Sequence, residues 1–442
     1  AVAAKTAVAG QTFTLTTSVE QVNGGAGNDT FYGTHTTLTS GDAITGGAGS
    51  DTLNVTTNTA SGTAYTSLPT LSGVETVSVT NLNAGSDTDT VNLVNSTGVT
   101  GLVNKSSSQS VTFSNVQEAA KITVDGATAG TTSATFKNTL ASGTADSLSL
   151  EVKNGATAVF EATGVTTSNV FETINLASTG ATKNTVSFAA TTAAGIKTVN
   201  ASGAGDLSIS LEKTASKAVY DGSAATGKQT IAIAAGDTGS ASAFYVETVK
   251  GGSGNDVIDV TDLVGGSQAA TTFFGSTAAK SIVGGDGTDT LIVSESVTAL
   301  TSSSATGALH SVTGVETIEG SYANATSSAT TPAIYADLFP TSSIYGALAT
   351  SSSGANTLSV TRLGADQKVQ VSGTQSSTGV NNLTVAQKVA AGAADAITVE
   401  LISPNTNTTT TTPAANVLGT ITVSTSTDSA YTETLNLVAT NP

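Results

Sequence analysis

The chain has 442 residues, carries 32 Asp and Glu against 15 Lys and Arg, and contains no Cys, Met or Trp. The absence of Cys excludes disulfides and thiolate-bound metals, and the sparse Lys and Arg form no basic patch for nucleic acid. No apolar run reaches the roughly 18 residues that a membrane-spanning helix requires, so we expect no membrane span.

Short runs of alternating apolar and polar residues recur along the chain, whereas helical periodicity is weak. The runs are rich in Val, Ile and Thr and are separated by Gly, Ser, Asn or Asp, which is typical of β-strands. In chain order, such runs start at Thr76, Thr90, Ser110, Lys121, Ser147, Glu172, Asn184, Asp206, Lys217 and Gln229. Their spacing of roughly 10–16 residues fits an all-β sandwich, barrel or solenoid.

A second repeat, Glu-Thr followed by an apolar residue, favours the solenoid among these architectures. It occurs at Glu75, Glu172, Glu247, Glu316 and Glu433, with a variant at Lys197. A strand type that recurs in this way suggests stacked coils, because one coil cannot bury its apolar face alone. The other interpretation is that Thr-rich strands produce these matches by chance.

Four segments match the nonapeptide Gly-Gly-x-Gly-x-Asp-x-apolar-x: residues 24–32, 46–54, 251–259 and 284–292. Glycines permit a tight turn whose carbonyl oxygens point inward, and the Asp adds a carboxylate. The apolar residue two positions after the Asp begins a strand that anchors the turn to a core. Such an oxygen-only cage suits Ca²⁺, and stacked copies form a β-roll with ions between the turns.

We expect one calcium ion to be shared within each pair of turns, with Asp29 and Asp51 as donors in one pair and Asp256 and Asp289 in the other. The expected metal ligands are Gly24, Ala26, Asn28, Asp29, Asp42, Gly46, Ala48, Asp51, Gly251, Ser253, Asn255, Asp256, Gly284, Asp286 and Asp289. The alternative is that these segments are glycine-rich turns that bind no metal.

The spacing of the turns differs between the two pairs. Two nonapeptides make one coil of about 18 residues in a regular β-roll. Gly24 and Gly46 are 22 residues apart, which fits one coil with a small insertion and a degenerate turn at Ser40–Ile44. Gly251 and Gly284 are 33 residues apart and require a larger insertion over residues 260–281.

The nonapeptides, together with the stretch from Ile44 to Val103, resemble the RTX-type surface-layer (S-layer) proteins of Gram-negative bacteria, most closely the Caulobacter type. The resemblance implies a β-solenoid that self-assembles into a calcium-dependent two-dimensional lattice on the outer cell surface. It also implies type I secretion, and attachment to lipopolysaccharide through a helical domain that this chain does not show.

Other chemistry is expected to be absent. Residues 222–229 approach a phosphate-binding loop, but they have Gln229 in place of the Ser or Thr and lead into a strand rather than a helix. The two histidines, His35 and His310, stand outside any zinc-protease motif. With one Arg and two His, a β-helix lyase or epimerase is disfavoured, and we expect no enzyme.

We therefore predict an all-β, right-handed parallel β-roll or β-helix-like solenoid with calcium-binding Gly-Asp turns. Its expected parts are an RTX-like segment over 1–75, a β-solenoid over 76–250, a second RTX-like segment over 251–295 and a C-terminal β domain over 296–442. The expected function is that of a secreted, self-assembling S-layer subunit. The alternative is a calcium-binding repeat domain of a secreted RTX adhesin, although adhesin repeats are usually near-identical and these are divergent.

Overall fold

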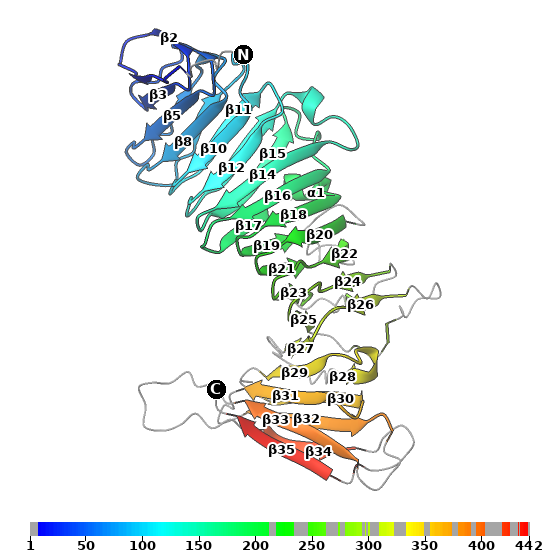
Figure 1. Cartoon of the computed structure of the whole chain (residues 1–442). Helices are drawn as coiled ribbons and strands as arrows, with labels where there is room; N and C mark the ends of the chain where they lie inside the picture. The colour runs from blue at the N-terminus through cyan, green and yellow to red at the C-terminus, as the bar shows by residue number, and fades with distance from the viewer. Residues whose placement is uncertain are drawn as a thin grey trace, which may run out of the picture. The chain divides into compact units, whose positions relative to one another are not determined.

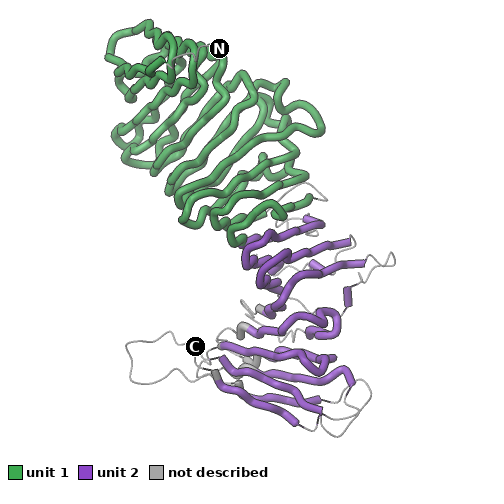
Figure 2. Tube along the Cα trace, viewed as in Figure 1, with its two compact units in different colours: residues 1–229 green, residues 230–442 purple. Residues whose placement is uncertain are grey.

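The computed structural model describes residues 8–211, 218–233, 246–261, 273–274, 279–293, 297, 299–300, 309–321, 333–348, 354–373, 379–389, 395–402, 418–424, 432 and 434–440. The chain forms two compact units, residues 1–229 and 230–442 (Figure 2). The four segments expected from the sequence stay a prediction. Among the described residues, no helix is long and apolar enough to cross a membrane.

In the first unit, strands stack into three parallel sheets (Figure 1). Sheet A contains, in order, β1 (Thr12–Thr14), β3 (Thr30–Thr34), β5 (Thr52–Thr57), β8 (Thr76–Asn81), β10 (Gly101–Lys105), β12 (Lys121–Asp125), β14 (Ser147–Lys153), β16 (Thr173–Thr179), β18 (Thr198–Gly203) and β20 (Ala218–Ala225). Sheet B contains β2 (Gln21–Ala26), β4 (Ala43–Ala48) and β7 (Thr70–Ser72). Sheet C contains β6 (Thr66–Ser67), β9 (Asp89–Asn92), β11 (Val111–Val116), β13 (Thr131–Phe136), β15 (Thr157–Gly164), β17 (Asn184–Phe188) and β19 (Leu207–Leu211).

The second unit has the same parallel stacking, in three runs of strands. One run contains β21 (Gln229–Ile233), β23 (Val257–Asp259), β25 (Thr290–Val293), β27 (Thr317–Ser321), β29 (Ser343–Leu348), β31 (Lys368–Gly373), β33 (Ala396–Ile402) and β35 (Thr434–Thr440). A second run contains β22 (Val246–Lys250), β24 (Ser281–Val283) and β26 (Ser311–Thr313). The third run is a four-stranded sheet of β28 (Ala333–Tyr335), β30 (Gly354–Leu363), β32 (Gly379–Gln387) and β34 (Leu418–Val423).

Both units are therefore parallel β-solenoids, which confirms the predicted fold class. The described helical residues are confined to α1 (Ala190–Gly195) and to two 3₁₀ turns, η1 (Asn138–Leu140) and η2 (Ala336–Leu338). All ten runs that the sequence predicts as strands lie on strands, from β8 to β21; the first residue of one run, Lys217, lies outside the described residues.

The coils are longer than in a regular β-roll. Thr30 pairs in register with Thr52, and Thr52 with Thr76, so successive coils take 22 and 24 residues. In the second unit, Val257 pairs with Thr290, a coil of 33 residues. The first spacing is thus one whole coil in which sheets A and B both contribute a strand. Most of the insertion expected over residues 260–281 lies outside the described residues.

The core consists of columns of apolar side chains, one from each coil. In sheet A, one column runs through Phe31, Leu53, Val77, Leu102, Ile122 and Leu150, which pair in register and are at most 1% exposed. Alternate residues of each strand face outward, and these are mainly Thr, Ser and Asn. A register slip of one residue would exchange the two faces, so burial of the columns holds the parallel register.

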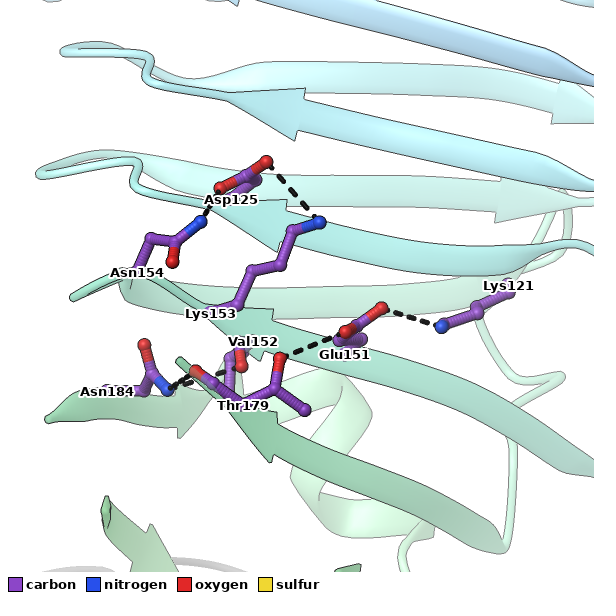
Figure 3. Close-up of polar contacts among 8 residues, drawn as sticks. All are labelled: Lys121, Asp125, Glu151, Val152, Lys153, Asn154, Thr179 and Asn184. Carbon is purple, nitrogen blue, oxygen red and sulfur yellow. Dashed lines mark hydrogen bonds and ion pairs between the residues drawn. The ribbon is translucent and has the colours of Figure 1, made fainter. Parts of the chain in front are cut away.

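The outer face of sheet A carries a few charges that neighbouring strands neutralise (Figure 3). Lys121 on β12 donates to Glu151 on β14 at 2.6 Å, and Thr179 on β16 donates to the other Glu151 oxygen at 3.0 Å. Asp125 pairs with Lys153 at 3.5 Å and accepts from Asn154 at 2.6 Å. Opposite charges one coil apart leave this part of the face close to neutral.

A core substitution should test the column packing. Phe113 is fully buried on β11, where it pairs in register with Val91 and Ala134. We expect Phe113→Ala to lower the free energy of unfolding by about 3–5 kcal/mol in a urea titration at fixed calcium. Val159→Ala, on the exposed side of β15, is the control and should change it by about 0.5 kcal/mol or less. Equal effects of the two variants would contradict this packing.

The face charges predict a pH dependence. Partial burial acts to raise the pKa of Glu151, but the hydrogen bonds from Lys121 and Thr179 and the charges of Lys121 and Lys153 outweigh it and lower the pKa. Because the folded-state pKa is the lower one, this stabilisation is complete above the ordinary pKa and is lost as the pH falls through the folded value. Glu151→Gln should therefore be less stable than the parent at pH 7 and equally stable at pH 3, measured by urea unfolding. A deficit that persists undiminished at pH 3 would contradict it.

Candidate calcium sites

The four nonapeptides form the turns between consecutive strands of neighbouring sheets. The first two join β2 to β3 and β4 to β5, and the last two join β22 to β23 and β24 to β25. Gly25 and Gly27 have φ of 96° and 106°, and Gly285 and Gly287 have φ of 118°. Only glycine adopts this conformation without strain, which explains the Gly-Gly-x-Gly pattern.

The turns also stack too closely for side chains at these glycines. A Cβ built on Gly47 would lie 1.9 Å from the carbonyl oxygen of Gly25 in the preceding coil. In the second pair, a Cβ built on Gly285 would lie 2.1 Å from the carbonyl oxygen of Gly252. Each glycine pair therefore allows backbone to meet backbone, which brings carbonyl oxygens of adjacent turns together.

The nonapeptide aspartates form a ladder through the stacked turns. The backbone N–H of Asp29 donates to Oδ1 of Asp51 at 2.7 Å, and that of Asp256 donates to Oδ1 of Asp289 at 2.7 Å. Gln11 starts the first ladder, because its N–H donates to Oδ1 of Asp29 at 2.6 Å. All four aspartates are at most 1% exposed. One oxygen of Asp29, Asp51 and Asp289 thus holds the register of the turns.

In three of the four aspartates, the second carboxylate oxygen lies near a glycine carbonyl oxygen and not near a donor. Oδ2 of Asp29, Asp51 and Asp289 is buried and has no hydrogen-bond partner among the described residues. A Cβ built on Gly24 would lie 2.2 Å from Oδ2 of Asp29 and 2.6 Å from the carbonyl oxygen of Gly46. Two acceptors facing one point repel each other unless a cation lies near, and oxygen donors of this kind fit Ca²⁺.

The second pair of turns has the same arrangement with one difference. A Cβ built on Gly251 would lie 2.6 Å from Oδ2 of Asp256 and 1.9 Å from the carbonyl oxygen of Gly284. Here Oδ2 of Asp256 also accepts the N–H of Gly252 at 2.7 Å. Burial raises the pKa of the Asp289 carboxyl to about 6, and the negative charges of Asp256, Glu316 and Asp286 add to this effect. The cause is a buried carboxylate that lacks a neighbouring cation.

Two other buried aspartates, Asp89 and Asp42, accept hydrogen bonds from protein donors on both carboxylate oxygens. Asp89 is fully buried and accepts from the Tyr65 N–H at 2.9 Å, from Asn83 at 2.8 Å and from the Thr57 hydroxyl. Asp42, an expected ligand, accepts from the Glu20 N–H at 2.8 Å and from the Thr39 N–H at 2.7 Å. Both oxygens of Asp42 therefore hold a turn before β4, in a position separate from the aspartate ladder.

The remaining expected ligands lie at the tips of the turns. Asn28 accepts the N–H of Ser50 at 3.0 Å, and Asn255 accepts that of Thr288 at 3.0 Å, so both side chains bridge adjacent turns. The carbonyl of Gly24 accepts from Gln11 Nε2 at 2.8 Å. The third nonapeptide residue is exposed in every turn: Ala26, Ala48, Ser253 and Asp286. The carbonyl of Ala48 accepts the Gly27 N–H at 2.7 Å.

Among the residues that the structure describes, side chains alone do not form a metal cage. In the described part of the chain, no group of three or more His, Asp or Glu side chains could hold an ion. Carbonyl oxygens of the glycines must therefore supply most of the ligands, as the nonapeptide pattern implies.

Comparison with known families supports this interpretation. A family model described as "RTX calcium-binding nonapeptide repeat (4 copies)" matches residues 17–34, 39–55 and 245–260. The chain carries RTX calcium-binding repeats. Calcium is therefore its cofactor, and RTX repeats of this kind are typical of secreted proteins. No curated protein matches the chain.

Three residues of the RTX turns are not among the ligands expected from the sequence. Gln11 begins the first ladder, and the Glu-Thr motifs at Glu75 and Glu316 continue the two ladders into a further coil. Both motifs read Gly-Val-Glu-Thr and follow the second nonapeptide of a pair, which is a signal in the sequence. The motif by itself predicts only a recurring strand.

Two sequence features that resemble a nucleotide-binding or a catalytic motif do not form such sites. Gly222 lies on β20 and Gln229 starts β21, so no helix begins at the loop that approaches a phosphate-binding motif. His310 is buried, and its Nδ1 accepts the N–H of Lys280 at 3.0 Å. The RTX β-solenoid is a structural fold that is not typically catalytic, and the absence of enzymatic activity stays a prediction.

Substitution of a ladder aspartate should separate calcium binding from folding. Asp29→Asn keeps the acceptor for the Gln11 N–H but removes the charge, so calcium affinity should fall at least tenfold in a calorimetric titration. Melting in EGTA should be unchanged or higher, because a buried unpaired charge is lost. Asp89→Asn is the control: it should lower the melting temperature equally with and without calcium. The same calcium isotherm for Asp29→Asn and the parent would contradict the site.

Proposed function

We propose that this chain is the structural subunit of an S-layer, a calcium-dependent two-dimensional lattice on the outer surface of a Gram-negative cell. The observation that carries the proposal is the distribution of charge. Four of the buried acids, Asp29, Asp51, Asp256 and Asp289, lie in the calcium ladders at the turns, while the outer face of sheet A presents mainly neutral polar side chains and paired charges. Flat faces of this kind can pack closely against other copies once the acids are neutralised.

The outer face of sheet A shows this neutral character in residue columns. Thr12, Thr30, Thr52 and Thr76 pair in register. Asn175 and Asn200 pair one coil apart, and Asn200 Nδ2 donates to Asn175 Oδ1 at 2.9 Å. Uncharged ladders of this type let two sheet faces approach without burying an unpaired charge.

In this proposal, calcium binding triggers folding and assembly. The chain has a formal net charge of −17, and like charges repel strongly when they lie closer than about 8 Å at physiological salt. Ions bound in the ladders lower the negative charge and stiffen the turns. Free calcium is scarce inside a cell and abundant outside, so the chain would stay exportable by type I secretion and fold outside.

Attachment to the cell is part of the same proposal. We propose that lipopolysaccharide binding resides in a region outside this chain. The divergence of the coils favours a lattice subunit over the alternative, an RTX adhesin.

Electron microscopy at defined calcium tests the proposal. Purified protein at millimolar calcium should form periodic two-dimensional arrays that disperse on addition of EGTA and return when calcium is restored. Magnesium at the same concentration is the control and should not restore them, because Mg²⁺ gives up its water shell reluctantly. Calcium-loaded, folded protein that stays monomeric at high concentration would contradict the lattice and support the adhesin.

A further inference from the structure

Both aspartate ladders continue into a third coil that contains no nonapeptide. The third coil enters β8 through Ser72-Gly73-Val74-Glu75-Thr76 and enters β27 through Thr313-Gly314-Val315-Glu316-Thr317. We call these two segments the closing turns. Gly73 and Gly314 have the same positive φ of 60°, so the two closing turns share a backbone conformation as well as a sequence.

The first closing turn repeats the contacts made between nonapeptides. The N–H of Asp51 donates to Oε2 of Glu75 at 2.7 Å, as the N–H of Asp29 donates to Asp51. A Cβ built on Gly46 would lie 1.9 Å from the carbonyl oxygen of Gly73 and 2.4 Å from Oδ2 of Asp51. The Gly73 carbonyl therefore faces the unpartnered Asp51 oxygen, just as a nonapeptide glycine does.

The second closing turn has the same geometry in the other unit. The N–H of Asp289 donates to Oε2 of Glu316 at 2.7 Å. A Cβ built on Gly284 would lie 1.7 Å from the carbonyl oxygen of Gly314 and 2.6 Å from Oδ2 of Asp289. Asp289 is fully buried and its Oδ2 has no partner among the described residues. Two independent ladders thus end in the same set of opposed acceptor oxygens.

In two other Glu-Thr motifs, a lysine of the next coil lies at the position after the glutamate. Lys197, one coil after Glu172, places its ammonium 3.8 Å from the Glu172 carboxylate. Lys280 occupies the same position one coil after Glu247, since Thr248 pairs with Ser281.

The coils that follow the closing turns lack this lysine. Thr100 follows Glu75, and its N–H donates to the Glu75 carbonyl at 2.9 Å. Ser342 holds the corresponding position after Glu316, because Ser343 donates to the Glu316 carbonyl at 2.8 Å. Their hydroxyl groups carry no charge, so the acids of the closing turns have no cation from the next coil.

We propose that each closing turn completes one more calcium site, beyond the ion shared by the two nonapeptides. The ligands are the Asp51 carboxylate, the Gly73 carbonyl and the Glu75 carboxylate in the first ladder. In the second they are Asp289, the Gly314 carbonyl and Glu316. Three coils, rather than two, are then joined by calcium in each ladder. This inference rests on calcium binding and is independent of lattice assembly.

The calcium stoichiometry of the full chain tests this assignment. Glu75→Gln keeps an acceptor for the Asp51 N–H but removes the charge, so the number of ions bound in a calorimetric titration with calcium chloride should fall by one. Glu316→Gln should remove one ion independently, and the double variant should lose both. Glu172→Gln is the matched control, and it should bind as many ions as the parent because Lys197 already neutralises that position.

A second pair of variants tests the proposal even if the glutamine variants do not fold. Thr100→Lys and Ser342→Lys copy the Glu172 and Lys197 arrangement, so each should displace one calcium ion. Melting in EGTA should be preserved or raised, because the ammonium stabilises the acid in place of calcium. An unchanged ion count in folded Glu75→Gln and Glu316→Gln would overturn the proposal. If those variants do not fold, an unchanged count in Thr100→Lys and Ser342→Lys would overturn it.

Discussion

The structure depends on in-register parallel stacking, because this arrangement sets each residue above its counterpart in the next coil. Stacking suits apolar side chains, whose columns fill the interior from Phe31 to Leu150. Stacking is unfavourable for acidic side chains, because it places their carboxylate oxygens beside backbone carbonyl oxygens. Both groups are hydrogen-bond acceptors, so they repel each other. The Asp29 and Asp51 oxygens that face glycine carbonyls are the consequence, and each requires a positive charge from elsewhere.

The solenoid answers this electrostatic problem in three ways. Asp89 is surrounded by hydrogen-bond donors from the protein. Glu172 receives an ammonium group from Lys197 in the next coil. Oδ2 of Asp29, Asp51 and Asp289 has neither among the described residues, and the RTX turns bind calcium instead. In our proposal, the glutamate of a Glu-Thr motif binds calcium or does not, according to the residue one coil later.

Calcium binding at the turns and the low charge of the sheet faces are related. The sheet faces use Thr, Ser and Asn, and paired charges such as Lys121 and Glu151 cancel across one coil. Six of the 32 acidic residues lie in the two calcium ladders: Asp29, Asp51, Glu75, Asp256, Asp289 and Glu316. An ion bound at those turns changes the stability of the coils and the net charge of the protein in one step.

The sequence by itself determined the strands, the parallel solenoid and the calcium turns, because these follow from local rules. Alternation specifies a strand, and a turn with positive φ beside a tightly stacked neighbour needs glycine. Tertiary structure alone decided that glutamates extend the two aspartate pairs. Asp51 reaches Glu75 across 24 residues, and Asp289 reaches Glu316 across 27. Coil length varies with each insertion, so spacing along the chain could not reveal these partners; the backbone pairing of the stacked coils did.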